Sequence, residues 1–95
     1  MVMFKFWVSV RAYNMGRRYG LPMIDYWSYY SDKELQEMFA ATGYAVLNAK
    51  RGLKTGAELL RAAGFGCSQI AAITHSDMRT VKAWCEVWDM RLHNA

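Results

Sequence analysis

Four side chains in the second half of the chain are of types that bind metal ions or act as nucleophiles. They are Cys67, His75, Cys85 and His93, separated in turn by eight, ten and eight positions. Structural zinc sites take their ligands in close pairs, roughly two to five residues apart, and neither cysteine has a second one close to it. The spacing therefore predicts two reduced thiols, buried or half-buried, and no metal site.

Arrangements of residues that carry out catalysis are missing from the sequence. It contains no glycine-rich phosphate loop, no serine elbow and no carboxylate pair. His75 and His93 have no nucleophile beside them, so we expect a turn residue and a partner for a helix C-terminus. The sequence predicts a protein that is not an enzyme, with no catalytic residue and no cofactor.

Residues 64 to 84 have the pattern of a short helix, a tight turn and a second, longer helix. Ser68 can cap the short helix over 69–74, and Ser76 or Asp77 can cap the longer one. The apolar residues of the longer helix recur at helical spacing and form one stripe that faces a core. These residues are Val81, Trp84, Cys85, Trp88 and Leu92.

This segment resembles the helix-turn-helix units of bacterial and phage regulators and of resolvases and transposases. The residues that carry the resemblance are Gly64, Phe65, Gln69, Ile70, Ala71, Thr74, Arg79, Thr80, Val81 and Trp84. Three positions depart from the usual pattern: His75 replaces the turn glycine, Ser76 an apolar residue and Gly66 a capping serine. Glycine is usual in such a turn because the backbone takes a positive φ there, and histidine tolerates that region.

The resemblance implies that the second helix lies in the major groove of DNA and reads base edges. Arg79 would bind guanine through two hydrogen bonds, and Met78 would contact a thymine methyl group. The hydroxyl groups of Ser68 and Thr80 would contact backbone phosphates. The implied base-reading residues are Asp77, Met78, Arg79, Lys82, Ala83 and Glu86.

The charge of the chain lies outside this segment. Of the net charge of +4, residues 1–54 carry all, with eight basic against four acidic side chains, and residues 55–95 have four of each. Because contacts with phosphates require a basic surface, DNA binding requires that upstream cations fold onto the side of the molecule that faces DNA. The candidates are Arg17, Arg18, Lys50, Arg51 and Lys54.

A run of aromatic residues indicates a second kind of function. Tyr26, Trp27, Tyr29 and Tyr30 fall within six positions, and they cannot all point inward from one helix or strand. Tyrosine and tryptophan are enriched at the centres of protein interfaces, so all four are candidate interface residues; the alternative is an aromatic core. This run supports an inhibitor or adaptor that binds a protein partner and has a helix-turn-helix shape without reading DNA.

The rest of the sequence predicts a mainly helical domain with one N-terminal strand. Residues 4–13 alternate between two faces, as a half-buried strand does, and 14–22 have the composition of a loop. Ser31 to Glu34 and Thr55 to Glu58 both have the form of a capping box. We expect the first helix to bury Leu35, Met38, Phe39 and Thr42 and to end at Gly43, and the second to end at Gly64. The pattern over 44–50 fits a helical turn or an extended segment.

These expectations combine into a single domain over 1–95, made of the strand and aromatic segment (1–30), helices (31–63) and the helix-turn-helix (64–95). The expected function is that of a sequence-specific transcriptional regulator that binds double-stranded DNA, of a kind found in phages and mobile elements. We expect a homodimer formed through the strand or the aromatic segment. No apolar run is long enough to span a membrane and no signal-peptide layout is present, so the expected location is the cytoplasm.

Overall fold

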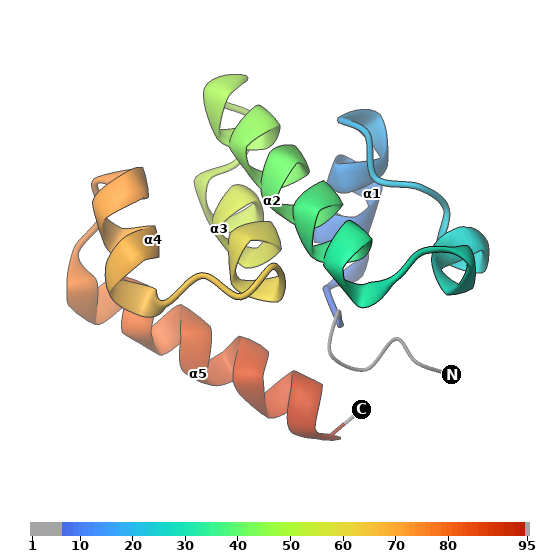
Figure 1. Ribbon diagram of the computed structural model, residues 1–95. Coiled ribbons are helices and arrows are strands. Elements are labelled where there is room, and N and C mark those ends of the chain that lie inside the picture. The colour runs from blue at the N-terminus through green and yellow to red at the C-terminus, as the bar shows by residue number, and fades with distance from the viewer. Residues whose placement is uncertain (1–6, 95) are drawn as a thin grey trace.

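The helix α3 (Leu53–Ala62) lies between the other helices of the fold (Figure 1). The computed structural model describes residues 7–94. α1 (Val10–Arg18) and α2 (Asp32–Asn48) pack on one side of α3, and α4 (Cys67–Thr74) and α5 (Met78–Asn94) pack on the other. A short 3-10 helix, η2 (Ile24–Tyr29), connects α1 to α2. The mainly helical prediction is confirmed, and residues 7–94 contain no strand.

The strand predicted for residues 4–13 is wrong where the structure describes it. Residues 4–6 lie outside the described part of the chain, 7–9 have no regular structure, and α1 begins at Val10. Ser9 caps this helix, because its Oγ accepts a hydrogen bond from the Ala12 amide at 3.1 Å. A single strand would leave its backbone groups unpaired, whereas a helix pairs them within itself. The predicted loop over 14–22 is also too long, since α1 continues to Arg18.

The capping box at the start of α2 is confirmed. The Glu34 amide donates to Ser31 Oγ at 3.1 Å, and the Ser31 amide donates to Glu34 Oε1 at 2.8 Å. Of the four residues predicted to face inward, three are buried and Met38 is half-buried. The buried ones are Leu35, Phe39 and Thr42.

Gly43 does not end α2, which continues to Asn48. It lies instead where α2 crosses α3: a Cβ atom on Gly43 would be 3.1 Å from the Gly56 carbonyl oxygen and 2.9 Å from Leu60 Cδ2. A glycine within a helix therefore marks a close approach of two helices here and not a helix end.

The capping box predicted at Thr55 is wrong. α3 begins two residues earlier, at Leu53, with Gly52 at its N-cap and no side chain bonded there. Glu58 instead binds Ser9, the residue that caps α1, and so connects α3 to α1. The predicted end is confirmed, because α3 ends at Ala62 and Gly64 takes a φ of 105°.

Two apolar clusters hold the fold together, and α3 contributes to both. Leu59 belongs to a first cluster with α1, η2 and α2. Ala57 and Leu60 belong to a second cluster with α4 and α5. The first contains Ala12, Leu21, Trp27, Leu35, Phe39, Val46 and Leu59, and the second contains Ala57, Leu60, Ile70, Ala71, Val81, Cys85 and Trp88. The unit formed by α3, α4 and α5 therefore shares its central helix with the rest of the fold.

Candidate nucleic-acid interface

A three-residue turn joins α4 to α5. His75 takes the left-handed conformation, with φ 54° and ψ 35°, as the sequence predicted for this position. The Ser76 amide donates to Ala71 O at 3.0 Å and the His75 amide donates to Ala72 O at 3.4 Å. These two bonds form the Schellman arrangement, which satisfies the last carbonyl groups of a helix and ends it. The histidine thus does the work of the usual turn glycine.

The start of α4 differs from the prediction. Gly66 occupies the N-cap, and its amide donates to the side-chain oxygen of Gln69 at 2.9 Å. Ser68 lies inside the first turn and is exposed, so the prediction that it caps the helix is wrong. Exposed hydroxyl and amide groups at a helix start can approach a phosphate. The phosphate contact predicted for Ser68 is therefore compatible with its position and stays a prediction.

Small and branched side chains fill the angle between α4 and α5, as the spacing predicted. Ile70 and Val81 are fully buried, and Ala71 is buried beside them. Trp84 is half-buried and packs on this cluster, and its ring lies near Trp88 at 6.0 Å between centroids. Close packing of this kind holds the two helices in one orientation.

Arg61 of α3 fastens α5 from the other side. Its Nε and Nη2 donate to the two carboxylate oxygens of Asp89 at 3.1 and 2.7 Å, and its Nη1 donates to the Phe65 carbonyl at 2.9 Å. The hydrogen bond to Asp89 raises the pKa of Arg61. One guanidinium therefore connects α3, the loop that leads to α4, and the second half of α5.

All six predicted base-reading residues are exposed. Five of them lie on the first half of α5, and Asp77 directly precedes it. Two acidic residues of the same region are already bound to other groups: Asp89 to Arg61, and Glu58 to Ser9. The outer face of α5 keeps an even balance of charge, because Arg79 and Lys82 adjoin Asp77 and Glu86.

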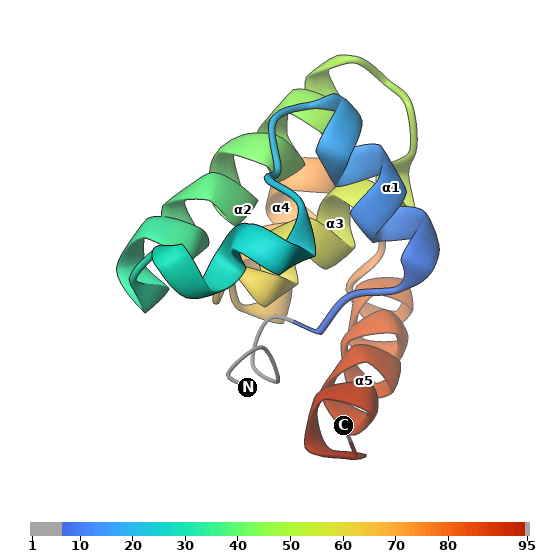
Figure 2. The ribbon, with the colours of Figure 1, turned by 90° about the vertical axis from the view of Figure 1, so that its right-hand side faces the viewer.

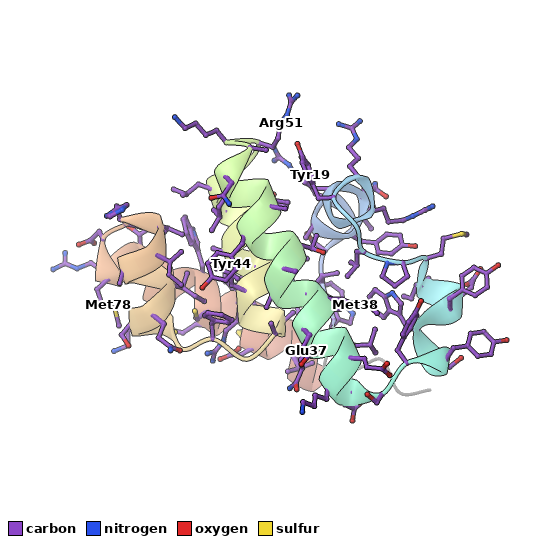
Figure 3. All side chains as sticks on the ribbon, turned by 45° about the horizontal axis from the view of Figure 1, so that its top comes forward. Tyr19, Glu37, Met38, Tyr44, Arg51 and Met78 are labelled. Carbon is purple, nitrogen blue, oxygen red and sulfur yellow. The ribbon has the colours of Figure 1, made fainter. Side chains whose placement is uncertain are left out.

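The upstream cations fall into two groups. Arg17 and Arg18 lie at the end of α1 that is distant from α5 (Figures 1 and 2). Arg51 lies near Tyr19 and far from Met78, the first residue of α5 (Figure 3), and Lys50 precedes it in the same turn. Lys54 lies beside α5, with its Nζ 6.0 Å from the centroid of the Trp84 ring.

A cleft of about 410 Å³ opens beside α5, between the first turns of α1 and α3. Arg11, Lys54 and Arg91 line it together with Leu53, Val87 and Trp88. Sequence reasoning missed Arg11 because it was assigned to a strand. It missed Arg91 although the helical spacing places that residue three positions after Trp88, on the flank of the apolar stripe.

The aromatic run divides between core and surface. Trp27 is buried: its Nε1 donates to Pro22 O at 2.9 Å, and its ring meets Phe39 edge to face at 5.3 Å. Tyr30 is half-buried. Tyr26 and Tyr29 remain 53% and 79% exposed, with ring centroids 6.1 Å apart. The run therefore contains both a core anchor and an exposed aromatic pair.

The two thiols are free, with Cys67 half-buried and Cys85 buried. Burial raises the pKa of Cys85 to about 12, and a hydrogen bond with Cys67 adds to the effect. Among the described residues, no three metal-binding side chains come together. No helix within residues 7–94 is both long enough and apolar enough to cross a membrane.

Comparison with protein-family models, with curated proteins and with solved structures found no match to this chain.

Proposed function

We propose that the protein is a sequence-specific transcriptional regulator that binds double-stranded DNA through α4 and α5. The observation that carries the proposal is the turn at His75. It joins two helices that pack on the buried Ile70 and Val81. The five residues of α5 that would read bases stay exposed: Met78, Arg79, Lys82, Ala83 and Glu86. In helix-turn-helix proteins, this arrangement presents the start of the second helix to the major groove.

The residues of α5 then have distinct roles. Arg79 binds O6 and N7 of a guanine through its guanidinium fork, and Lys82 binds a neighbouring base or phosphate. Met78 contacts a thymine methyl group, and Thr80 and Ser68 contact phosphates with the amides at the helix starts. Asp77 and Glu86 repel phosphates that lie out of register, which sets the position of α5 along the groove.

In this proposal the regulator acts as a homodimer in the cytoplasm and belongs to a phage or a mobile element. Because residues 7–94 contain no strand through which two copies could pair, the exposed pair Tyr26 and Tyr29 is the proposed dimer surface. A twofold dimer of this kind binds two half-sites about 34 Å apart, one turn of DNA, and so occludes a promoter.

The test is a fluorescence polarisation titration of random-sequence duplex at two salt concentrations, followed by selection of bound sequences. We expect Arg79→Ala to relax the preference at one base pair, at a cost of about 1–3 kcal/mol for the preferred sequence. Lys82→Ala should weaken binding further. The matched control is Arg18→Ala with Lys33→Ala, two exposed cations on other helices. If both α5 variants, Arg79→Ala and Lys82→Ala, bind duplex with the affinity and salt dependence of the wild type, a base-reading role of α5 is excluded.

A second function, binding of a protein partner, is favoured by the exposure of Tyr26 and Tyr29 beside Met23 and Ile24. An inhibitor or adaptor would use this surface and leave DNA unread. The folded protein would then fail to bind duplex at low salt, and Tyr29→Ala would abolish capture of the partner without lowering the melting temperature.

A further inference from the structure

We propose that the cleft between α1, α3 and α5 is a phosphate-binding site. Its rim carries three cations, Arg11, Lys54 and Arg91, and its volume of about 410 Å³ lies in the usual range for ligand sites, about 300–1,000 Å³. None of the three forms an ion pair within the described residues. The side chains of Lys54 and Arg91 lie over the rings of Trp84 and Trp7, at 6.0 and 5.5 Å from the ring centroids, which limits their motion.

The start of α3 adds hydrogen-bond donors to this positive field. Gly52 has no side chain with which to cap the helix, and no other side chain of the described residues is bonded there. The first amides of a helix have no partner within it and carry its positive dipole end. Gly52, Leu53 and Lys54 all line the cleft, so these donors lie beside the rim cations.

Thr55 supplies the observation that points to a ligand. The residue is only 7% exposed and lines the cleft. Its hydroxyl forms no hydrogen bond among the described residues. No fully buried side-chain oxygen in this part of the chain lacks a hydrogen-bond partner, so the Thr55 oxygen is accessible to solvent. The oxygen therefore opens into the cleft. The hydroxyl can therefore donate a hydrogen bond to a phosphate oxygen held by Lys54 and the α3 amides.

One carboxylate also lines the cleft, that of Glu58. Its two oxygens accept hydrogen bonds from the Ser9 amide at 2.6 Å and the Ser9 hydroxyl at 3.2 Å. Three cations against one bound carboxylate leave the cleft positive. The same contacts fix the start of α1 and with it the position of Arg11.

The phosphate has two possible sources, a phosphodiester of nucleic acid or a free phosphorylated molecule. The first source rests on the proposed function. Arg91 lies on α5 twelve residues after Arg79, and Lys54 lies over the ring of Trp84 on the same helix. In the proposed complex, the backbone of a DNA strand that runs along α5 would reach the cleft. It would supply the phosphate contact that Arg17 and Arg18, at the distant end of α1, cannot make.

The experiment compares Lys54→Gln/Arg91→Gln and Thr55→Val with the wild type and with a control of equal charge change, Arg17→Gln/Lys33→Gln. Affinity for random-sequence duplex is measured across a salt series. Separately, the melting temperature is measured with and without inorganic pyrophosphate. Thr55→Val keeps the side-chain shape and removes a hydroxyl that binds no group among residues 7–94, so it should fold like the wild type.

For a phosphodiester, the double variant should flatten the slope of log affinity against log salt by about 0.9 for each phosphate that it no longer neutralises. Thr55→Val should weaken binding about three- to tenfold, and the control should keep the wild-type slope. For a free ligand, duplex binding stays unchanged while pyrophosphate stabilises the wild type and neither cleft variant. If the cleft variants match the control in both assays, the proposal is overturned. Failure of base reading would show separately, as unchanged binding in Arg79→Ala with the cleft variants still impaired.

Discussion

The contact between Arg61 and Asp89 joins α5 to α3, and a double-mutant cycle can measure its contribution to stability. Two of the three hydrogen bonds of the Arg61 guanidinium go to Asp89, and one goes to the Phe65 carbonyl. Replacing either residue by alanine removes the fork that joins α3 to α5. The expected effect is lower stability together with weaker duplex binding under the proposed function, because the fork no longer fixes α5 on α3.

The size of the effect follows from geometry and exposure. Charge-assisted hydrogen bonds contribute about 1.5–3 kcal/mol when shielded from water. The two side chains are 28% and 40% exposed, and solvent screening reduces the pair to about 1 kcal/mol. The bond to the Phe65 carbonyl adds about 1 kcal/mol. Arg61→Ala should therefore lower the free energy of unfolding by about 2 kcal/mol and the melting temperature by roughly 10 °C, and Asp89→Ala by half as much.

Urea unfolding of the wild type, both single variants and the double variant gives the coupling energy, expected at about 1 kcal/mol. Arg61→Lys keeps the charge and loses the planar fork, so it should recover less than half of the stability that Arg61→Ala removes. The control cycle uses Arg18 and Asp25, which form no ion pair with each other. A coupling energy equal to that of the control, at low salt, would refute the reasoning.

Three further predictions concern pH and packing. Hydrogen bonds from the Ser31 amide and then from its hydroxyl lower the pKa of Glu34. The wild type should therefore be more stable than Glu34→Gln near neutral pH, and this difference should vanish as pH falls through the lowered pKa; a difference that persists in acid would contradict this. Burial raises the pKa of Cys85 from 9.0 to about 12, so the contribution of its thiol to folding stability should be complete below about pH 9 and lost as pH rises toward 12. Alkylation near pH 8 should therefore modify Cys67 first, and equal labelling of both thiols in the folded protein would contradict this. Gly43→Ala places a methyl group 2.9 Å from Leu60 Cδ2 and should destabilise by about 1–2 kcal/mol in chemical denaturation despite better helix propensity; a variant as stable as the wild type would show that the helices can move apart.

Local signals in the sequence predicted the elements whose ends are set by their own residues. The capping box at Ser31, the left-handed turn at His75 and the inward stripe at Val81 and Cys85 were all predicted correctly. Each depends on groups within a few positions along the chain, so the pattern carries the whole interaction.

The errors came where a residue serves a distant partner. Glu58 resembled half of a capping box and instead binds Ser9, 49 positions away. Gly43 resembled a helix end and instead allows the backbone of α3 to approach. The alternation over 4–13 predicted a strand that needs a second strand to pair with, and residues 7–94 contain none. The strand prediction also hid Arg11 as a cleft residue.

The sequence by itself determined a helical chain with a short helix, a turn and a longer helix near its C-terminus, because capping and 3.6-residue periodicity act locally. It also determined which side of α5 would stay exposed. Only the tertiary structure decided which charges surround that helix. Packing of α1 and α2 on α3 carries Arg17 away from α5 and Arg51 away from Met78, and it brings Arg11 and Lys54 to the cleft beside Arg91. Distances between residues far apart in the chain depend on how helices pack, and no local pattern encodes them.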